Sequence, residues 1–314
     1  MAGLELDQFN LEYRDKSNAL WIGNSPKALA TKIIRPGEVA GVPFYLDSSH
    51  FGLESAGEVS GKYLEDLGIH VRSRYAHLGL NVGERELRNI LGTLDSASIK
   101  GSGIGLIIPI MNLSSRPVRV NEGFGVFSLF HIPESAYIRG HELERMVGNK
   151  SDKSVFIQGE EGEDWKFIYN ENVGGFTTGL FLRLQDWYYI PASDEEVDVS
   201  NFSTFKEFRS WFERNSIHHK YPHLEVPNQL LIAKGPNLIL APNICLRLGS
   251  EVFLEDDKGN FRRFAEQTAS PIIDGIRTAH RPHFEVANRS WESLDGRFWI
   301  GVTAVRDGSM VKKS

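Results

Sequence analysis

The chain of 314 residues is 41% hydrophobic and 24% charged, which is typical of a globular protein and excludes an intrinsically disordered one. Its 35 basic and 41 acidic residues leave a net charge of −6, which disfavours a nucleic-acid-binding protein because such proteins carry a basic patch or stripe. No apolar run approaches the roughly 18 residues of a membrane span, and the mixed, acidic N-terminus lacks a secretory signal. We therefore expect a cytoplasmic protein with no nucleic-acid or membrane partner.

Cys245 is the single cysteine of the chain. One cysteine excludes an internal disulfide and a cysteine-rich zinc site. It also excludes the zinc-dependent nucleobase deaminases, which need an H-x-E motif followed by P-C-x-x-C. The apolar neighbours in LILAPNICLRL favour a buried, inert thiol over a nucleophile.

Strands dominate the predicted structure of the first half of the chain. β-branched and aromatic runs bounded by Gly, Pro, Asn and Ser predict strands at 33–47, 104–113, 116–123 and 124–132. After Pro133 the pattern indicates a short helix or an irregular connection. The acidic stretch 150–165 is typical of a linker.

A second set of strand-like runs follows. They lie at 179–191, 224–235, 236–249, 251–256, 282–290 and 297–305. Many strands with few helices favour sandwiches or barrels over alternating βαβ units, and the length fits two such domains in tandem.

The segment FSTFKEFRSWFERN predicts a helix between these strands. Its aromatic residues fall on one helical face: Phe202, Phe205, Phe208, Trp211 and Phe212. Thr204 and Glu207 stand in capping-box register at its start. We interpret the aromatic stripe as core packing against a sheet rather than as a cofactor site.

The two halves of the chain share an order of elements. Each half contains an aliphatic–Asp turn, then a strand ending in Asn, then a Gly-containing turn and a final apolar strand. The first half reads GTLDS, IGLIIPIMN and NEGFGVFSLF, and the second reads PIIDG, HFEVAN and LDGRFWIGVTAV. Weak internal symmetry of this kind indicates duplication of one supersecondary unit.

These segments resemble the dCTP deaminase and dUTPase superfamily. The family pattern runs L-x-PGE, G-R-S-S-L-G-R-L-G-L, A-G-x-I-D-P-G, L-E-x-x-N and P-G-x-x-I-G-Q. In this chain the matching residues are Pro36, Gly37 and Glu38; Arg72, Ser73, Leu78, Gly79 and Leu80; Gly92, Leu94 and Asp95; Ile273 and Asp274; Phe284, Glu285 and Asn288; and Gly296, Ile300 and Gly301. Their order, together with the stretch GFTTGLFLRLQDWYYIP from 175 and the Phe/Trp helix, resembles the duplicated, two-domain bacterial form of dCTP deaminase.

The resemblance implies a mainly β fold of tandem, duplicated dUTPase-like jelly-roll or β-clip domains with a few short helices. It places the first domain at 1–150, linker strands and the helix at 151–223, and the second domain at 224–314. It implies assembly as a homo-oligomer, a trimer or its duplicated equivalent. Pockets between neighbouring units would bind a deoxynucleoside triphosphate with Mg²⁺ and no zinc.

Glu285 is the catalytic residue that the resemblance implies for hydrolytic deamination of dCTP to dUTP. Without zinc a carboxylate must act as acid and base, and in an apolar strand this glutamate would be partly desolvated with a raised pKa. The alternative is a strand residue facing solvent. Pro109 occupies the same place in the first repeat, so each site would be composed of both repeats.

Arg72, Ser73 and Arg74 match the family segment that contacts the triphosphate, with Asn288 as a further substrate-binding match. His77 stands where the family has an active-site arginine, and a histidine can also bind phosphate. The alternative for VRSRY is a solvated strand edge. We assign no metal ligands, because the histidines at 218, 219, 223, 280 and 283 lack a carboxylate at an established ligand spacing.

Asp95 and Asp274 match the family position that contacts the deoxyribose 3′-hydroxyl and that, in dUTPases, activates water. An aspartate in a tight turn also hydrogen-bonds its own backbone. Three hypotheses therefore stand: a zinc-independent dCTP deaminase, a dUTPase-like diphosphatase using Asp95 or Asp274, and a catalytically degenerate nucleotide-binding or assembly protein of the same fold.

Overall fold

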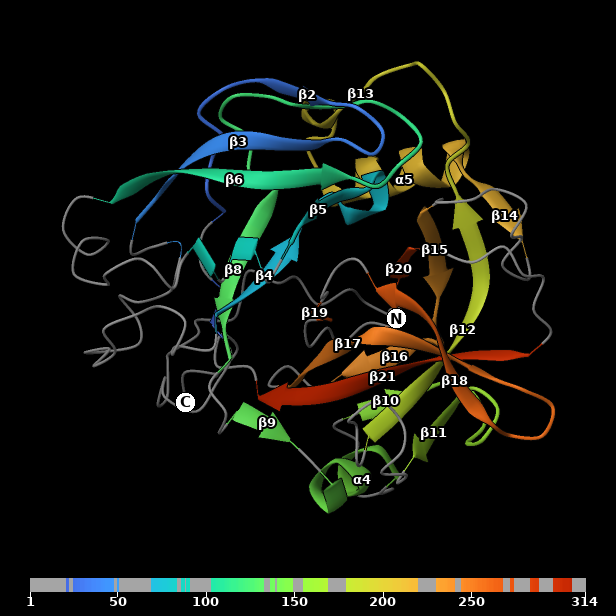
Figure 1. Cartoon of the computed structure of the whole chain (residues 1–314). Coiled ribbons are helices and arrows are strands. Elements are labelled where there is room, and N and C mark those ends of the chain that lie inside the picture. The colour runs from blue at the N-terminus through green and yellow to red at the C-terminus, as the bar shows by residue number, and fades with distance from the viewer. Residues whose placement is uncertain are drawn as a thin grey trace, which may run out of the picture.

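The computed structural model (Figure 1) combines an N-terminal sandwich with a closed barrel that is built mainly from the second half of the chain. The description that follows covers residues 21–22, 25–47, 50, 69–83, 86–87, 89–90, 103–132, 136–138, 140–148, 155–168, 179–219, 230–240, 244–267, 272–273, 283–287 and 296–306.

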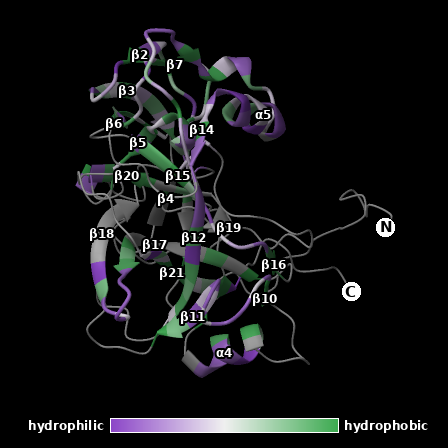
Figure 2. Cartoon of the chain, turned by 90° about the vertical axis from the view of Figure 1, so that its right-hand side faces the viewer, coloured by the Kyte–Doolittle hydropathy of each residue, from purple (hydrophilic) through white to green (hydrophobic). Residues whose placement is uncertain are grey.

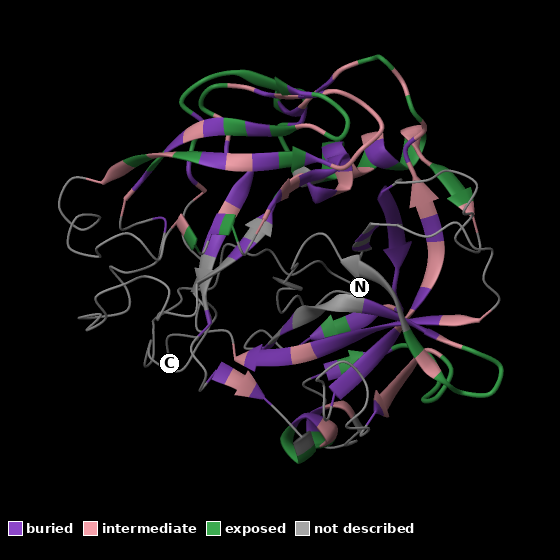
Figure 3. Ribbon diagram, viewed as in Figure 1, coloured by how far each residue is buried: buried purple, intermediate pink, exposed green. Residues whose placement is uncertain are grey.

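The sandwich is made of short sheets packed around one apolar core. One sheet contains β3 (Val39–Leu46), β6 (Ile104–Asn112) and β5 (Leu80–Val82); a second contains β1 (Trp21–Ile22), β8 (Phe127–His131) and β4 (Ile69–Ser73); a third contains β13 (Val197–Asp198), β7 (Val118–Val120) and β2 (Lys32–Ile34). The rings of Phe44 and Phe127 meet edge to face, 5.0 Å apart, and join the first two sheets. Burial alternates along β3 and β6 (Figure 3), as expected of strands with one face on a core.

The run 33–47 is two strands rather than the single strand that its composition predicts. β2 ends at Ile34 and β3 begins at Val39. Pro36 and Gly37 form the turn between them, with Gly37 at a φ of 73°, and the amide of Glu38 donates back to the carbonyl of Arg35. The P-G-E motif is therefore the turn that reverses the chain.

The barrel is a ring of antiparallel strands that closes because β12 pairs with strands on both of its sides. In order around the ring they are β12 (Gly179–Tyr189), β15 (Leu230–Lys234), β20 (His283–Ala287), β18 (Phe261–Gln267), β17 (Ile244–Glu255) and β21 (Arg297–Arg306). The run 251–256 is the end of β17 and not a separate strand, and a break in register after Leu248 lets the long strand bend.

Shorter strands border the ring. β9 (Tyr137–Ile138) pairs with β21, β11 (Trp165–Ile168) and β14 (Ile217–His219) pair with β12, β19 (Ile272–Ile273) pairs with β17, and β10 (Val155–Ile157) pairs with β16 (Leu238–Leu240). Within the stretch 150–165, whose role as a linker stays a prediction, the apolar residues at 155–157 form β10.

The helices α4 and α5 of the described part of the chain lie at opposite ends of the molecule (Figure 2). Helix α5 (Phe205–Asn215) confirms the predicted helix and its capping box: the hydroxyl of Thr204 accepts from the amide of Glu207. Phe208 and Phe212 are buried in the sandwich core, as the aromatic stripe predicts. Of the two alternatives after Pro133, a short helix or an irregular connection, the structure has the helix α4 (Gly140–Gly148), and Leu143 and Met146 pack in the barrel core.

Segments from the middle of the chain contribute to both cores. Residues 190–212 supply side chains to the sandwich core, whereas β9 and α4 join the barrel core. The division at 150 and 223 stays a prediction. Strand β15 lies between the two cores. Leu230 and Ile232 belong to the sandwich core, whereas Leu231 and Ala233 belong to the barrel core.

Candidate functional site

Glu285 lies in β20 on the strand face that looks toward the sandwich. Its neighbours Phe284 and Val286 are buried in the barrel core, and successive residues of a strand occupy opposite faces. Position 285 pairs with Ile232, which is 1% exposed and belongs to the sandwich core. The described residues next to position 285, which are Ile232, Phe284 and Val286, are therefore buried rather than exposed to solvent. The side chain of Glu285 itself lies outside the described residues.

Position 285 belongs to a row of paired residues that crosses three neighbouring strands of the barrel. Tyr188 of β12 pairs with Ile232 of β15, which pairs with Glu285 of β20. Two residues further along β15, past a shift in the register of β12, Lys234 pairs with Gln185 and with His283. Lys234 is 9% exposed, an unusual state for a lysine. Sequence reasoning missed Lys234 and Tyr188, although a single cation that ends the apolar run LLIA is a visible signal.

The predicted phosphate-binding segment begins in β4 and ends in the 3₁₀ helix η4 (Ala76–Leu78). Ser73 is buried, and its hydroxyl oxygen accepts from the amide of Val82, 3.1 Å away, which leaves the O–H hydrogen to donate elsewhere. The side chain of Arg74 is exposed, while its amide donates to the carbonyl of Val126. Arg72 pairs with Ser128, and its side chain lies outside the described residues.

His77 is half-buried against helix α5. Its ring meets the rings of Phe208 and Phe212 edge to face, with centroids 5.8 Å and 5.2 Å away. Phe212 in turn lies 6.3 Å from the ring of Tyr188. The ring of Phe212 therefore stands between His77 and the row that contains position 285. The helix that joins the repeats brings the two parts of the candidate site toward each other across this aromatic layer.

Burial alters one titratable group beside this segment. The pKa of Tyr75 is raised because its phenol is desolvated, and the nearby Arg74 guanidinium only partly offsets the shift. The Tyr75 ring meets Phe208 edge to face at 5.9 Å. Tyr75 therefore stays a neutral hydrogen-bonding group at physiological pH.

The motif residues of the first repeat converge on Asn112, the last residue of β6. Its amide donates to the carbonyl of Glu38, and its carbonyl accepts from the amide of Gly37. The amide of Leu113 donates to the carbonyl of Gly79. Three separate motifs thus meet in one hydrogen-bonded junction, which gives them a structural role in the sandwich.

Several predicted residues fall outside the described part of the chain. These are Asp95, Asp274 and Asn288. Cys245 lies in β17 opposite Val305, and its side chain is outside the description as well. Within the described ranges, no group of three or more His, Cys, Asp and Glu side chains is arranged to hold a metal. No helix in that part of the chain is both long and apolar enough to cross a membrane.

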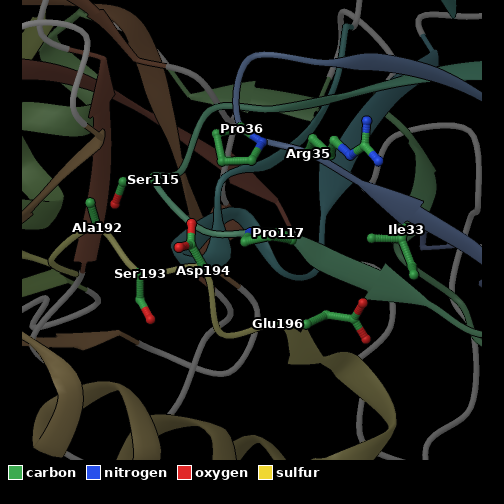
Figure 4. A pocket seen from close by; sticks show the side chains of 9 residues that line it. All are labelled: Ile33, Arg35, Pro36, Ser115, Pro117, Ala192, Ser193, Asp194 and Glu196. Carbon is green, nitrogen blue, oxygen red and sulfur yellow. The ribbon is translucent and has the colours of Figure 1, made fainter.

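A pocket of about 410 Å³ opens at the edge of the sandwich, away from these residues (Figure 4). It lies between the β2–β3 turn and the connection to β13, and its lining comprises Ile33, Arg35, Pro36, Ser115, Pro117, Ala192, Ser193, Asp194 and Glu196. Two of its polar side chains are engaged by the chain: Ser115 donates to the carbonyl of Ile190, and Glu196 pairs with Arg119. None of the residues predicted for the site lines this pocket.

No protein-family model matches the chain, and no curated protein matches it. Among solved structures, it is similar to a 2′-deoxycytidine 5′-triphosphate deaminase from Agrobacterium tumefaciens. The similarity covers 98% of this chain and 90% of that chain, with a TM-score of 0.51 and 14% sequence identity. The chain therefore has a dCTP deaminase/dUTPase-like fold, which confirms the predicted resemblance and the mainly β fold class. At 14% identity, the similarity shows the fold and does not show which reaction is catalysed.

Proposed function

We propose that this chain is a nucleotide-processing enzyme that converts dCTP to dUTP by zinc-independent hydrolytic deamination. The observation that carries the proposal is the place of Glu285, on a strand face between the sandwich and the barrel and opposite the buried Ile232. The likeness to a dCTP deaminase over nearly the whole chain supports it.

The proposed chemistry needs one group that accepts a proton and later donates it. Glu285 takes a proton from water as the oxygen bonds to C4 of cytosine, and it passes this proton to N3, which receives the electrons of the C4=N3 double bond. It then takes the proton of the new C4 hydroxyl and passes it to the amino group, so that C4=O forms as the C4–N bond to the amino group breaks and ammonia leaves. A carboxylate with apolar neighbours holds a proton more readily than one in water, which suits both steps.

Substrate binding is assigned to the residues matched by the family pattern. Arg72, Ser73, Arg74 and His77 would contact the triphosphate, and Asn288 is a further substrate-binding residue. Asp95 and Asp274 would bind the deoxyribose 3′-hydroxyl. Mg²⁺ would enter with the nucleotide, held by the phosphate oxygens, as this ion prefers. The cytoplasm remains the expected location.

We also propose that copies of this chain associate through the outer face of β3 and β6. Val39, Tyr45, Ile107 and Met111 are 54%, 42%, 69% and 38% exposed there, and Tyr45 pairs with Gly105. None of the residues on this face is charged, so two copies of a chain with net charge −6 avoid repulsion there. The space above Gly105 is open, so Ile107 of one copy can fill it reciprocally.

Ammonia release from dCTP with Mg²⁺ tests the proposed reaction, with wild type compared against Glu285→Gln. We expect the amide to abolish turnover, by about a hundredfold or more, because it cannot accept the proton. Glu195→Gln is the matched control, since the Glu195 side chain is 84% exposed, and it should leave turnover unchanged.

Other outcomes select the alternatives. Turnover that survives Glu285→Gln would move the base to Asp95 or Asp274. Release of pyrophosphate from dUTP without ammonia from dCTP would favour the diphosphatase. Binding of dCTP with neither product would leave a degenerate nucleotide-binding protein.

A further inference from the structure

Lys234 ends β15 as the one cation of a strand whose other residues are Leu230, Leu231, Ile232 and Ala233. It is 9% exposed. The ammonium nitrogen is not one of the fully buried side-chain atoms that lack a hydrogen-bond partner, so the aliphatic stem is buried while the charged end keeps contact with solvent. The contacts around Lys234 therefore indicate whether the lysine serves the fold or a ligand.

The described contacts of the Lys234 ammonium are few. It lies 4.3 Å from the centroid of the Tyr188 ring, a cation–π contact. The nearest carboxylate oxygen, from Glu213, is 4.0 Å away, which is longer than a hydrogen bond. That carboxylate accepts from Arg209 at 3.2 Å and is 46% exposed. Among the described residues, the ammonium thus donates no hydrogen bond.

Lys166 in the same sheet shows what a structurally satisfied lysine looks like in this protein. Its ammonium lies 2.6 Å from a carboxylate oxygen of Glu255. It also lies over two rings, those of Trp299 at 4.2 Å and Phe261 at 4.5 Å. The indole of Trp299 donates to the other oxygen of the same carboxylate. Lys234 is more deeply buried than this group and has weaker partners.

The register places Lys234 beside the proposed catalytic position. Lys234 pairs with His283, and Ile232 pairs with Glu285, so positions 234 and 285 are diagonal neighbours on one strand face. Diagonal neighbours in an antiparallel pair are about 7–8 Å apart, and a lysine side chain reaches over that span. An anion bound at this face would supply the acceptors that the described residues do not provide for this solvent-accessible ammonium.

We propose that Lys234 is a substrate-binding residue that donates to the triphosphate of the nucleotide at the Glu285 site. This inference rests on the proposed function for the identity of the anion. Tyr188 and Glu213 hold the ammonium in place, and the phosphate oxygens complete its hydrogen bonds. Free phosphate shares this chemistry, so the test must separate the nucleotide from a simple polyphosphate.

Calorimetry with dCTP, inorganic tripolyphosphate and deoxycytidine tests the proposal on wild type, Lys234→Met and Lys234→Arg. We expect Lys234→Met to weaken dCTP binding about ten- to a hundredfold, the cost of a charge-assisted hydrogen bond, and to leave deoxycytidine binding within twofold. Lys234→Arg keeps the positive charge and should retain much of the dCTP affinity that Lys234→Met loses. Lys206→Met, on the exposed side of α5, is the matched control and should bind dCTP like wild type.

Thermal unfolding separates a binding role from a structural one. Lys234→Met should keep Tm, because methionine retains the buried apolar stem and only weak contacts of the ammonium are lost, whereas Lys166→Met breaks a close ion pair and should lower Tm. Unchanged dCTP binding in Lys234→Met, or a fall in Tm equal to that of Lys166→Met, would overturn the proposal.

The same experiments distinguish failure of this inference from failure of the proposed function. Loss of dCTP affinity in Lys234→Met, in a protein that releases no ammonia, would keep Lys234 as a nucleotide-binding residue and remove the deaminase. Tripolyphosphate binding without preference for dCTP would reduce the site to a general anion site. Wild-type protein that binds neither compound would overturn both proposals.

Discussion

The side-chain nitrogen of Asn112 donates a 2.8 Å hydrogen bond to the backbone carbonyl of Ile34, which lies 78 residues earlier in the chain. The same nitrogen donates to the carbonyl of Arg116, and the amide oxygen accepts from the backbone and the hydroxyl of Ser114. Asn112 is fully buried. One side chain thus joins β2 to the turn that follows β6.

Asn112→Ala should lower the free energy of unfolding by about 2–4 kcal/mol, because it leaves buried carbonyl groups without a donor. Urea unfolding measures the change. Asn237→Ala removes a single exposed hydrogen bond to Gln158 and should cost less than about 1 kcal/mol. Equal costs for the two variants would contradict the role assigned to Asn112.

Gly79→Ala should destabilise the protein far more than the same change at Gly123. Both residues have positive φ, 77° and 81°, so both substitutions cost about 1 kcal/mol or more in backbone strain. A Cβ at Gly79 would lie 2.3 Å from the backbone nitrogen of Ser114, whereas a Cβ at Gly123 meets nothing within 4 Å. Chemical denaturation should give a difference of at least about 2 kcal/mol. Similar stabilities would show that the junction around Gly79 relaxes easily.

The capping box of α5 should make stability depend on pH through Glu207. The pKa of this carboxyl is lowered because it accepts hydrogen bonds from the hydroxyl of Ser203, the backbone amide of Ser203 and the backbone amide of Thr204. A lowered folded-state pKa contributes stability that is complete above the ordinary glutamate pKa of about 4.3 and is lost as pH falls through the folded value. Glu207→Gln should therefore have a lower free energy of unfolding than wild type at neutral pH, and this difference should disappear below about pH 4. Urea unfolding at a series of pH values measures it.

Thr204→Ala is the comparison for this pH series. It removes the hydroxyl cap and should cost about 1 kcal/mol. Because the hydroxyl does not titrate, most of that cost should persist in acid. A Glu207→Gln curve parallel to wild type at every pH would show that the carboxylate adds nothing to the cap.

Ile107→Glu should shift the protein toward monomers if the outer face of β3 and β6 joins copies of the chain. A charge on that face would be desolvated without a partner in the assembly. Mass photometry across a concentration series gives the distribution of species. Ile217→Glu changes another strand isoleucine, which is 40% exposed, and should leave the distribution unchanged. Identical distributions for Ile107→Glu and wild type would rule out this face as the interface.

The amino-acid sequence by itself determined the local structure. Helix α5 begins at its capping box and buries its aromatic face because cap, period and apolar stripe agree within a short segment. The strand runs and the order of family motifs likewise identified a mainly β, dUTPase-like fold. The errors were local too: Pro36 and Gly37 divide one predicted strand into β2 and β3, and the predicted strand 251–256 is the end of β17.

Only the tertiary structure decided which residues share a face. Closure of the barrel depends on β12 pairing with both β15 and β21, contacts between residues far apart in the chain that no local pattern encodes. That closure puts β15 between two cores, so that Lys234 is buried and position 285 lies beside it. A strand's period shows which residues alternate, but the partner strand and its register decide what each face meets.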